Sequence, residues 1–513
     1  MKRKLLYIFL PSLLWFGSCK EDFLNLSPET SITSASFYKT ATHFDQALTA
    51  SYVAMRAIAL NGLFMDEMRS DNTFFTLYSG DRGPYLSTEV LAEFLEDASS
   101  GTWLPNRYNG VYSGISRVNT ILNRIESSQM TDGEKKPVRA EALFLRAFYY
   151  FDLVQHWGPV PLMLNEVTNE ADAFQPNSTV EAIYAQIIKD VTEAIQLGLP
   201  VATTFPQSGR ATLGAAKMLL AYAYMTEPTR EYTKAEAALI DITKMNYGLL
   251  DNYADVFKLT NKNSKESILE VQYQAGEGGQ NSDFAWRMIP KCSNTEFLMG
   301  VGGSNTAGVS GGWCVPTQEM VDSYEKGDLR LNGSISVVEG KLSSELLVAS
   351  AVVEAAGYTP KPGTDYFYFV NKYFHPKYST TSNTGDNFPI YRYSGALLLL
   401  AECLVEQNKA AEALPYVNQV RKRAGLAPLS AVTKESVANE MRHELAFENH
   451  RWTDLIRTGK AIEKMKEHAV RMKALYPWLL PTAFDIQEYK LIYPFYYREL
   501  NVNKNLKQNL GYN

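Results

Sequence analysis

Cysteine is scarce in this chain, with four among 513 residues, at positions 19, 292, 314 and 403. No two of them have the close spacing of a zinc site, which excludes a fold held together by zinc. Cys292 and Cys314 flank a glycine-rich stretch, so we expect either a disulfide in an oxidising compartment or two separate buried thiols. Cys403 lies within an apolar helical pattern and is predicted to be part of the core.

An excess of positive charge is also missing. The chain has 50 Lys and Arg against 56 Asp and Glu, a formal net charge of −6, so we expect no nucleic-acid partner. Beyond residues 1–18 we find no apolar run of membrane-spanning length, because the stretch "GALLLLAECLV" from Gly395 is too short and contains Glu402. Hydrophobic residues make up 45% and charged residues 21% of the chain, the usual balance of a globular protein.

Sequence patterns of known catalytic sites are missing too. The segment "HELAFENH" from His443 has Phe447 where a zinc-protease helix needs its second histidine, so we expect a solvated helix face with ion pairs. Residues 308–312 satisfy G-x-S-x-G, but they lack the strand and helix that flank a nucleophile elbow. No phosphate-binding Walker motif is present. We therefore predict a protein without catalytic residues, cofactor or metal, although turnover of a bound ligand would restore the enzyme class.

The N-terminus has the layout of an export signal. Lys2, Arg3 and Lys4 precede a short apolar stretch that ends at Gly17-Ser18, directly before Cys19. This resembles the lipobox of bacterial lipoproteins, with Phe16 where leucine is usual, and the resemblance implies lipid attachment at Cys19. A cysteine that merely follows a plain signal peptide is the alternative. We predict a signal peptide over 1–18, then a lipid anchor and charged tether over 19–36.

Helical periodicity dominates two of the three remaining parts of the chain. Residues 37–245 form a series of amphipathic helical patterns, and helices resume over 391–513. Two helix pairs, in 219–242 and 399–420, share the pattern of tetratricopeptide repeats, although ordinary helical hairpins would look alike. Residues 246–390 are rich in glycine, serine, asparagine and aromatics. The predicted fold is mainly all-α, a tetratricopeptide-like superhelix with an irregular, loop-rich lobe that carries a few short strands.

Several motifs, in order along the chain, resemble the SusD/RagB family of outer-membrane nutrient-binding lipoproteins of Bacteroidetes. They are "RAEALFLRAFYYFDLVQHWGPVPL" from Arg139, "YRYSGALLLLAECLVE", "VNQVRKRAGL", "MRHELAFENHRWTDLIRTGK" and the tail "NLKQNLGY". The tail departs from the family pattern, with Leu506 and Leu510 where proline is common. The resemblance implies an oligosaccharide or peptide ligand, an outer-membrane location facing the exterior, and a SusC-like TonB-dependent transporter as partner. A peptide-binding member of the family and a protein-only adaptor stay open as alternatives.

Loops that carry both aromatic and planar polar side chains are the candidates for ligand binding. Sugar rings stack on aromatic faces, while their hydroxyls need polar partners. The alternative is that these aromatics only pack the lobe onto the helices. Trp103, Trp157, Trp452 and Trp478 lie in or beside helical patterns and are expected to be structural. The candidate ligand-binding residues are Asp71, Asn72, Phe75, Tyr78, Arg82, Tyr85, Asn281, Asp283, Trp286, Arg287 and Trp313.

Overall fold

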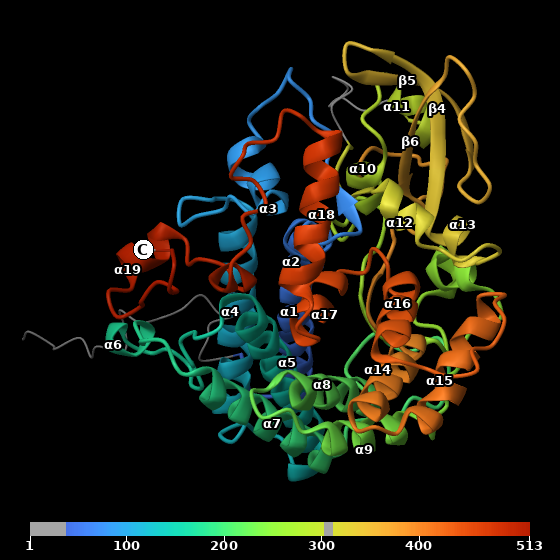
Figure 1. Cartoon of the computed structure of the whole chain (residues 1–513). Coiled ribbons are helices and arrows are strands. Elements are labelled where there is room, and N and C mark those ends of the chain that lie inside the picture. Colours follow the sequence, from blue (N-terminus) through green and yellow to red (C-terminus); the bar gives the residue numbers. More distant parts are fainter. Residues whose placement is uncertain (1–36, 302–310, 513) are drawn as a thin grey trace, which may run out of the picture.

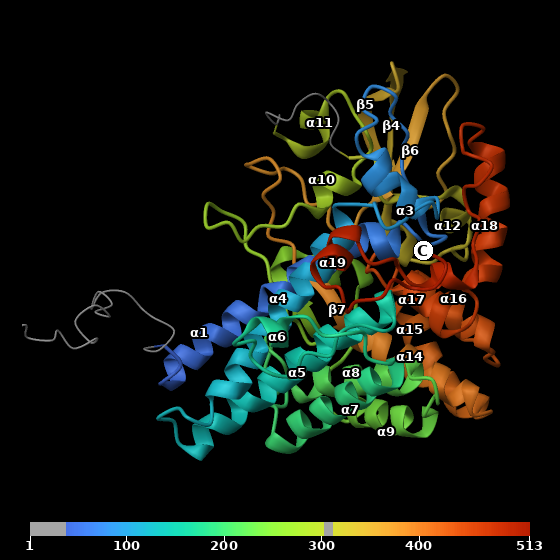
Figure 2. The same cartoon turned by 90° about the vertical axis from the view of Figure 1, so that its left-hand side faces the viewer.

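Most of the described chain folds into α-helices that stack one against the next. The computed structural model describes residues 37–301 and 311–512, so the predicted signal peptide, Cys19 and the tether lie outside the described residues (Figures 1 and 2). Helix α4 packs on α5, α5 on α7, α7 on α8 and α8 on α9; α14 then packs on α9 and on α15. The bounds are α4 Trp103–Arg124, α5 Asp132–Trp157, α7 Val180–Leu197, α8 Leu213–Thr226, α9 Tyr232–Thr243, α14 Tyr393–Glu406 and α15 Ala410–Arg423.

The two helix pairs that share the repeat pattern in the sequence are α8–α9 and α14–α15. They lie beside each other through the contact of α9 with α14, although about 150 residues, which include the loop-rich lobe, separate them in sequence. The predicted tetratricopeptide-like, mainly helical fold is therefore confirmed.

Local capping explains where the long helices begin. The Thr131 side chain accepts a hydrogen bond from the backbone of Glu134, whose carboxylate accepts one in return from the backbone of Thr131. This reciprocal pair starts α5. Thr179 caps the start of α7, because its side chain accepts from the backbone of Ala182, and Gly198 caps the end of α7 with a positive φ of 93°.

The sequence predicted a helical pattern at the start of one apolar run, but it did not predict that the run reaches membrane-spanning length. Residues Ala41–Glu67 are long and apolar enough to cross a membrane, but 61% of their most apolar window is buried inside the protein. The run comprises α1 Ala41–Tyr52, α2 Ala54–Gly62 and the π-helical turn η2 Leu63–Glu67, and α1 and α2 pack on α4. It is a core element of the helical stack.

The lobe of residues 246–390 is built around short sheets. Strands β4 Ile335–Ser343, β5 Leu346–Glu354 and β6 Asp365–Val370 form an antiparallel sheet in the order β5-β4-β6. It stands above α14 and α15 in Figure 1. The two nine-residue strands are longer than the few short strands expected. Two-stranded pairs link the lobe to other parts of the chain, namely β1 Thr73–Phe74 with β3 Val315–Pro316 and β2 Ser267–Val271 with β7 Phe388–Arg392. The predicted domain boundaries stay a prediction.

The remaining elements are short or lie at the C-terminal end. Around the lobe and the loops these are η3 Tyr85–Glu89, α3 Val90–Ala92, α6 Glu170–Ala173, η4 Tyr253–Phe257, η5 Leu259–Asn261, α10 Phe284–Met288, α11 Thr295–Met299, α12 Gln318–Asp322 and α13 Arg330–Ser334. Toward the C-terminus they are α16 Lys434–Glu444, α17 Arg451–Arg457, α18 Ala461–Leu475, η6 Glu488–Leu491 and α19 Tyr497–Val502.

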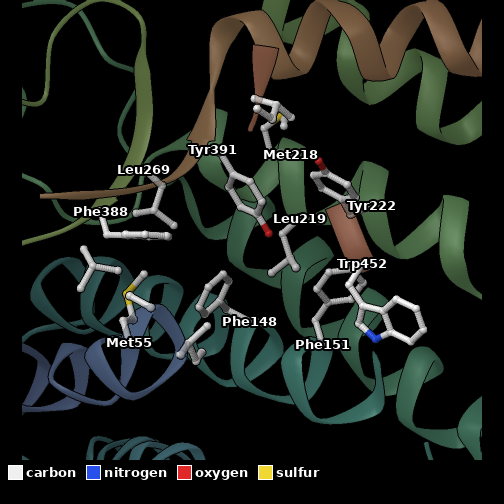
Figure 3. Packing of buried hydrophobic residues seen from close by; sticks show 14 of the residues in the cluster. Met55, Phe148, Phe151, Met218, Leu219, Tyr222, Leu269, Phe388, Tyr391 and Trp452 are labelled. Carbon is white, nitrogen blue, oxygen red and sulfur yellow. The ribbon is translucent and has the colours of Figure 1, made fainter. Parts of the chain in front are cut away.

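The core lies where β7 meets the helices. Figure 3 shows Phe388 and Tyr391 of β7 projecting towards Phe148 of α5, Met55 of α2 and Tyr222 of α8. The Tyr391 ring stacks on Tyr222 at 5.6 Å and meets Phe148 edge-on at 6.3 Å. All five side chains are buried, so this aromatic contact ties the lobe to the helical scaffold.

A buried ionic network fixes the same junction. Arg392, at the end of β7, is 2% exposed and forms ion pairs with Glu266 at 2.9 Å, Glu444 at 2.9 Å and Glu448 at 2.8 Å. Two of these glutamates belong to segment 443–450, for which a solvated helix face was expected. The expected ion pairs are present, but the expected exposure to solvent is wrong, because these carboxylates are desolvated and need the arginine as a buried counter-charge.

The cysteine pair is not a disulfide in this structure. Cys292 and Cys314 are free, buried thiols. Cys292 packs in a small cluster beneath the β4–β6 sheet, whereas Cys314 belongs to the main core and its thiol donates to the carbonyl of Leu63 at 3.0 Å. Burial raises the pKa of Cys292 to about 12. The alternative of two separate thiols therefore describes the structure, and Cys403 is buried as predicted.

Candidate functional site

Three of the loops singled out in the sequence meet at one place. The pairing of β1 with β3 brings the loop after Phe75 next to Trp313, and the backbone of Thr76 donates to the carbonyl of Gly312 at 2.8 Å. The backbone of Trp313 donates to the carbonyl of Arg287, at the end of α10, at 3.1 Å. In Figure 2, α3 and α10 lie in the upper half of the molecule, above the stacked helices.

Gly312 makes this close approach possible. Its φ is +80°, and a Cβ placed on it would lie 3.3 Å from the Cβ of Thr76 and 3.4 Å from the Cβ of Lys291. A side chain here would be strained and tightly packed, so glycine lets the segment before Trp313 run against both neighbours.

Two tryptophans share a buried phenylalanine at this place. Trp103, the first residue of α4, stacks on Phe64 with ring centroids 4.0 Å apart, and Trp313 meets Phe64 edge-on at 6.1 Å. Phe64 is fully buried, whereas both tryptophans are partly exposed. The indole nitrogen of Trp103 donates to the Thr88 hydroxyl at 2.8 Å, which fixes the orientation of its ring. The result is a rigid pair of aromatic surfaces that solvent can reach.

Polar groups stand beside these rings. The Arg287 guanidinium lies 5.6 Å from the Trp103 ring and 5.8 Å from the Phe64 ring. It forms a two-pronged ion pair with Asp283, with nitrogen–oxygen distances of 2.6 and 3.0 Å. The Arg287 and Asp283 side chains are 26% and 28% exposed. A held carboxylate and guanidinium beside tryptophan rings can bind both the hydroxyls and the apolar face of a sugar.

A lysine and the loop of residues 76–85 complete the edge of the site. The Lys291 ammonium lies 5.2 Å from the Tyr78 ring and 5.5 Å from the Trp313 ring. Burial lowers the pKa of Lys291 from its usual value. Arg82 pairs with Glu89 at 2.9 Å and lies over the Tyr85 ring at 5.4 Å.

Five predicted residues are therefore close neighbours of one another or of Lys291. They are Tyr78, Arg82, Asp283, Arg287 and Trp313. Tyr85 lies beside Arg82. Asn281 is half-buried and donates to the carbonyl of Ser382 at 2.6 Å, so its amide supports a neighbouring loop. We call the group of Trp103, Trp313, Asp283, Arg287, Lys291 and Tyr78 the tryptophan site.

Three predicted ligand contacts in the N-terminal half are interior residues instead. Asp71 is 2% exposed and pairs with Arg451 at 2.7 and 2.9 Å, and Arg442 donates to Asn72 at 2.8 Å. Burial alone would raise the pKa of Asp71, but the two arginines outweigh it and hold the pKa well below its usual range. Phe75 is 2% exposed and packs beneath Trp313. These residues position β1 and have no surface to offer a ligand.

Trp286, which was also predicted to contact ligand, is an interior residue as well. It is 4% exposed and belongs to the cluster beneath the β4–β6 sheet, beside Cys292 and Phe369. Although it is adjacent to Arg287 in sequence, consecutive residues of a helix point in different directions, so its ring faces inward while Arg287 faces the site.

Two members of the tryptophan site were missed from the sequence. Trp103 was assigned a structural role because it begins a helix, yet its place at the very first helical residue leaves part of its ring exposed. Lys291 carried no signal, because its position depends on contacts with Tyr78 and Gly312 that are distant in sequence. Within residues 37–301 and 311–512, no three His, Cys, Asp or Glu side chains are grouped so that they could hold a metal ion.

Comparisons with known proteins agree on one family. Residues 351–512 match the model of the SusD family, and residues 22–225 match a model described as starch-binding associating with outer membrane. A SusD-like protein, P38, of Formosa agariphila is 26% identical over 99% of this chain and 98% of its own length. A SusD-like protein of Bacteroides ovatus is 27% identical over 89% of this chain and 82% of its own.

The fold has similar solved structures as well. One is a laminarin-binding SusD-like protein with a TM-score of 0.73 and 26% sequence identity. The similarity covers 93% of this chain and all of that one, so the likeness extends to nearly the whole chain.

Proposed function

The chain belongs to the SusD/RagB family, and from this premise we propose that it captures oligosaccharides at the outer membrane and delivers them to a SusC-like TonB-dependent transporter. The observation that carries the proposal is the tryptophan site, in which two partly exposed indole rings stand beside the Asp283–Arg287 pair. The matched model described as starch-binding and the similar laminarin-binding structure support a glycan as the ligand class.

A glycan fits this site better than a peptide does. A peptide-binding groove would be expected to be poor in aromatics and rich in unpaired charge. Here the exposed rings of Trp103 and Trp313 are rigidly held, and the charges of Arg287 and Asp283 are paired. Such a site gains binding free energy when the apolar face of a sugar stacks on its rings. The paired carboxylate and guanidinium keep lone pairs and N–H groups for the hydroxyls of the sugar.

Titration of the purified protein with a panel of glycans tests this proposal. We expect binding to one class among maltooligosaccharides, laminarin oligosaccharides and other glycans. Trp313→Ala should lose about five-fold or more in affinity, because stacking of a nucleobase on an aromatic side chain is worth about 1–3 kcal/mol and we expect a stacked sugar to contribute a similar amount. Trp478→Ala is the matched control, because Trp478 is a partly exposed tryptophan that packs on Phe74 and Phe75 outside the tryptophan site. Equal affinity of the Trp313 variant and the wild type would refute the assignment of the site.

Anchoring and partnership are tested in the membrane. We propose that Cys19 carries lipid, so a Cys19→Ala variant should move from the membrane fraction to the soluble fraction, because the acyl chains that hold it are lost. We also expect a SusC-like TonB-dependent transporter to co-purify from detergent-solubilised outer membranes. If the purified protein still binds glycan but no such transporter co-purifies with it, a binding protein that acts alone would be favoured.

A further inference from the structure

Lys291 is an unusual residue for a protein interior. It is 6% exposed, yet among the described residues its ammonium group has no carboxylate at ion-pair distance and no hydrogen-bond acceptor. Residues 302–310, which precede Gly311 in the sequence, contain no acidic side chain. A buried lysine is ordinarily paired, because an ammonium group deprived of water and of an acceptor destabilises the fold.

The stem of this lysine is held while its tip remains reachable. The side chain runs past Gly312, where a Cβ would come within 3.6 Å of its Cδ. The Lys291 backbone carbonyl accepts a hydrogen bond from Leu347 of β5 at 3.0 Å, which fixes the start of the side chain. The ammonium nitrogen is not a fully enclosed atom that lacks a hydrogen-bond partner. Because it has no hydrogen-bond or ion-pair partner among the described residues, it retains contact with solvent.

The tip lies between two rings of the tryptophan site. Its nitrogen is 5.2 Å from the centre of the Tyr78 ring and 5.5 Å from that of the Trp313 ring. Asp81, Glu89 and Arg82 are the other charged groups that act on it. Arg82 is itself paired with Glu89, so within the described part of the chain Lys291 is the cation of this group whose N–H donors are unused.

We propose that Lys291 is a ligand contact, whose ammonium group donates hydrogen bonds to oxygen atoms of a sugar that stacks on Trp313. This inference rests on the proposed function. The acceptor oxygens can come from a pair of hydroxyls of a neutral sugar or from the carboxylate of a uronic acid. Either source supplies the acceptors that the described part of the chain does not, and charge-assisted hydrogen bonds of this kind contribute strongly to affinity.

Calorimetric titration of the purified protein and of Lys291→Met tests the inference. The probes are maltooligosaccharides and laminarin oligosaccharides as neutral glycans, and oligogalacturonate as an acidic one. Lys341→Met is the matched control, because Lys341 is an exposed lysine of the same lobe without an ion pair among the described residues. We expect Lys291→Met to bind the recognised glycan about ten-fold or more weakly, and Lys341→Met to bind like the wild type.

The thermal midpoint separates a binding role from a structural one. Because the ammonium group has no hydrogen-bond or ion-pair partner to lose among the described residues, Lys291→Met should melt at the wild-type temperature or above it. If Lys291→Met loses binding to oligogalacturonate, and the binding of this glycan to the wild type weakens with added salt, the acceptor is a carboxylate. If Lys291→Met loses binding to a neutral glycan, the acceptors are hydroxyls.

Two results would overturn the inference while leaving the proposed function intact. One is a Lys291→Met variant that binds with wild-type affinity while Trp313→Ala does not. The other is a Lys291→Met variant that melts several degrees lower than Lys341→Met, which would assign Lys291 a structural role. If the wild type binds no glycan of the panel, the proposed function fails, and this inference fails with it.

Discussion

Two aspartates that were both predicted to bind ligand are expected to respond in opposite ways to the same substitution. Asp71 is buried and pairs with Arg451, with side chains 3% and 9% exposed. Asp283 pairs with Arg287 at the tryptophan site, with side chains 28% and 26% exposed. The substitution to asparagine keeps the size of each side chain and removes its charge. It therefore tests whether each aspartate serves the fold or the site.

The structure sets the magnitudes. Asp71→Asn leaves the Arg451 guanidinium buried without its carboxylate, and removing one partner of such a buried pair costs about 3–5 kcal/mol. Asp283→Asn disrupts a half-exposed pair, which is worth about 1 kcal/mol or less. We expect Asp71→Asn to retain wild-type glycan affinity under conditions where it is folded, because the side chain does not reach the surface. Asp283→Asn should weaken binding instead, because Arg287 loses its orientation.

Urea unfolding followed by tryptophan fluorescence gives the free energy of unfolding of each variant, and calorimetry on the folded proteins gives the affinity. An Asp71→Asn variant that loses less than about 1 kcal/mol would refute the assignment of Asp71 to the interior. A folded Asp71→Asn variant with weakened glycan binding would restore Asp71 as a ligand contact. An Asp283→Asn variant as unstable as Asp71→Asn would contradict the description of the tryptophan site.

Three further predictions concern buried groups. Burial lowers the pKa of His468 to about 4, so as the pH falls the unfolded chain takes up a proton before the folded protein does, and the protein should lose stability between about pH 6.5 and pH 4. In urea titrations, His468→Leu should lose about 3 kcal/mol less of its free energy of unfolding over this range. Equal losses in the variant and the wild type would contradict the burial of a neutral histidine. The three described cysteines are buried and free, so a thiol reagent should modify none of them before denaturation, and a melting temperature that falls on addition of a reductant would instead reveal a disulfide. Arg392→Met should destabilise the protein by about 3–5 kcal/mol because it leaves three glutamates without their shared arginine. Adding Glu448→Gln to this variant should recover part of the lost stability. A urea midpoint of Arg392→Met equal to that of the wild type would argue against the network.

The sequence predicted the helical scaffold well because helical periodicity is a local signal. The pattern shared by 219–242 and 399–420 reflects apolar faces that pack within each helix pair and between α9 and α14. A helix was predicted at the start of Ala41–Glu67, but the membrane-spanning length of this run went unrecognised because polar residues are spread between its apolar ones. Its burial depends on the packing of α1 and α2 against α4, which is a tertiary property.

The tryptophan site could be predicted only in part. Trp313, Arg287 and Asp283 were identified because aromatic and planar polar residues in glycine-rich loops are typical of ligand sites. Asp71 was misassigned because its partner Arg451 lies 380 residues further along the chain, where no local pattern links the two. Trp103 was missed for a similar reason, since the ring that begins α4 is held at the site by its stacking on Phe64, a contact that no local pattern indicates.

The most direct test of the account is a calorimetric titration of the wild type, Trp103→Ala and Trp313→Ala with the same glycan panel. We expect the wild type to bind one glycan class and each substitution to weaken this binding about five-fold or more, with the fold intact by circular dichroism. Wild-type affinity in both variants would show that the ligand binds elsewhere. Absence of glycan binding by the wild type would contradict the proposed function itself.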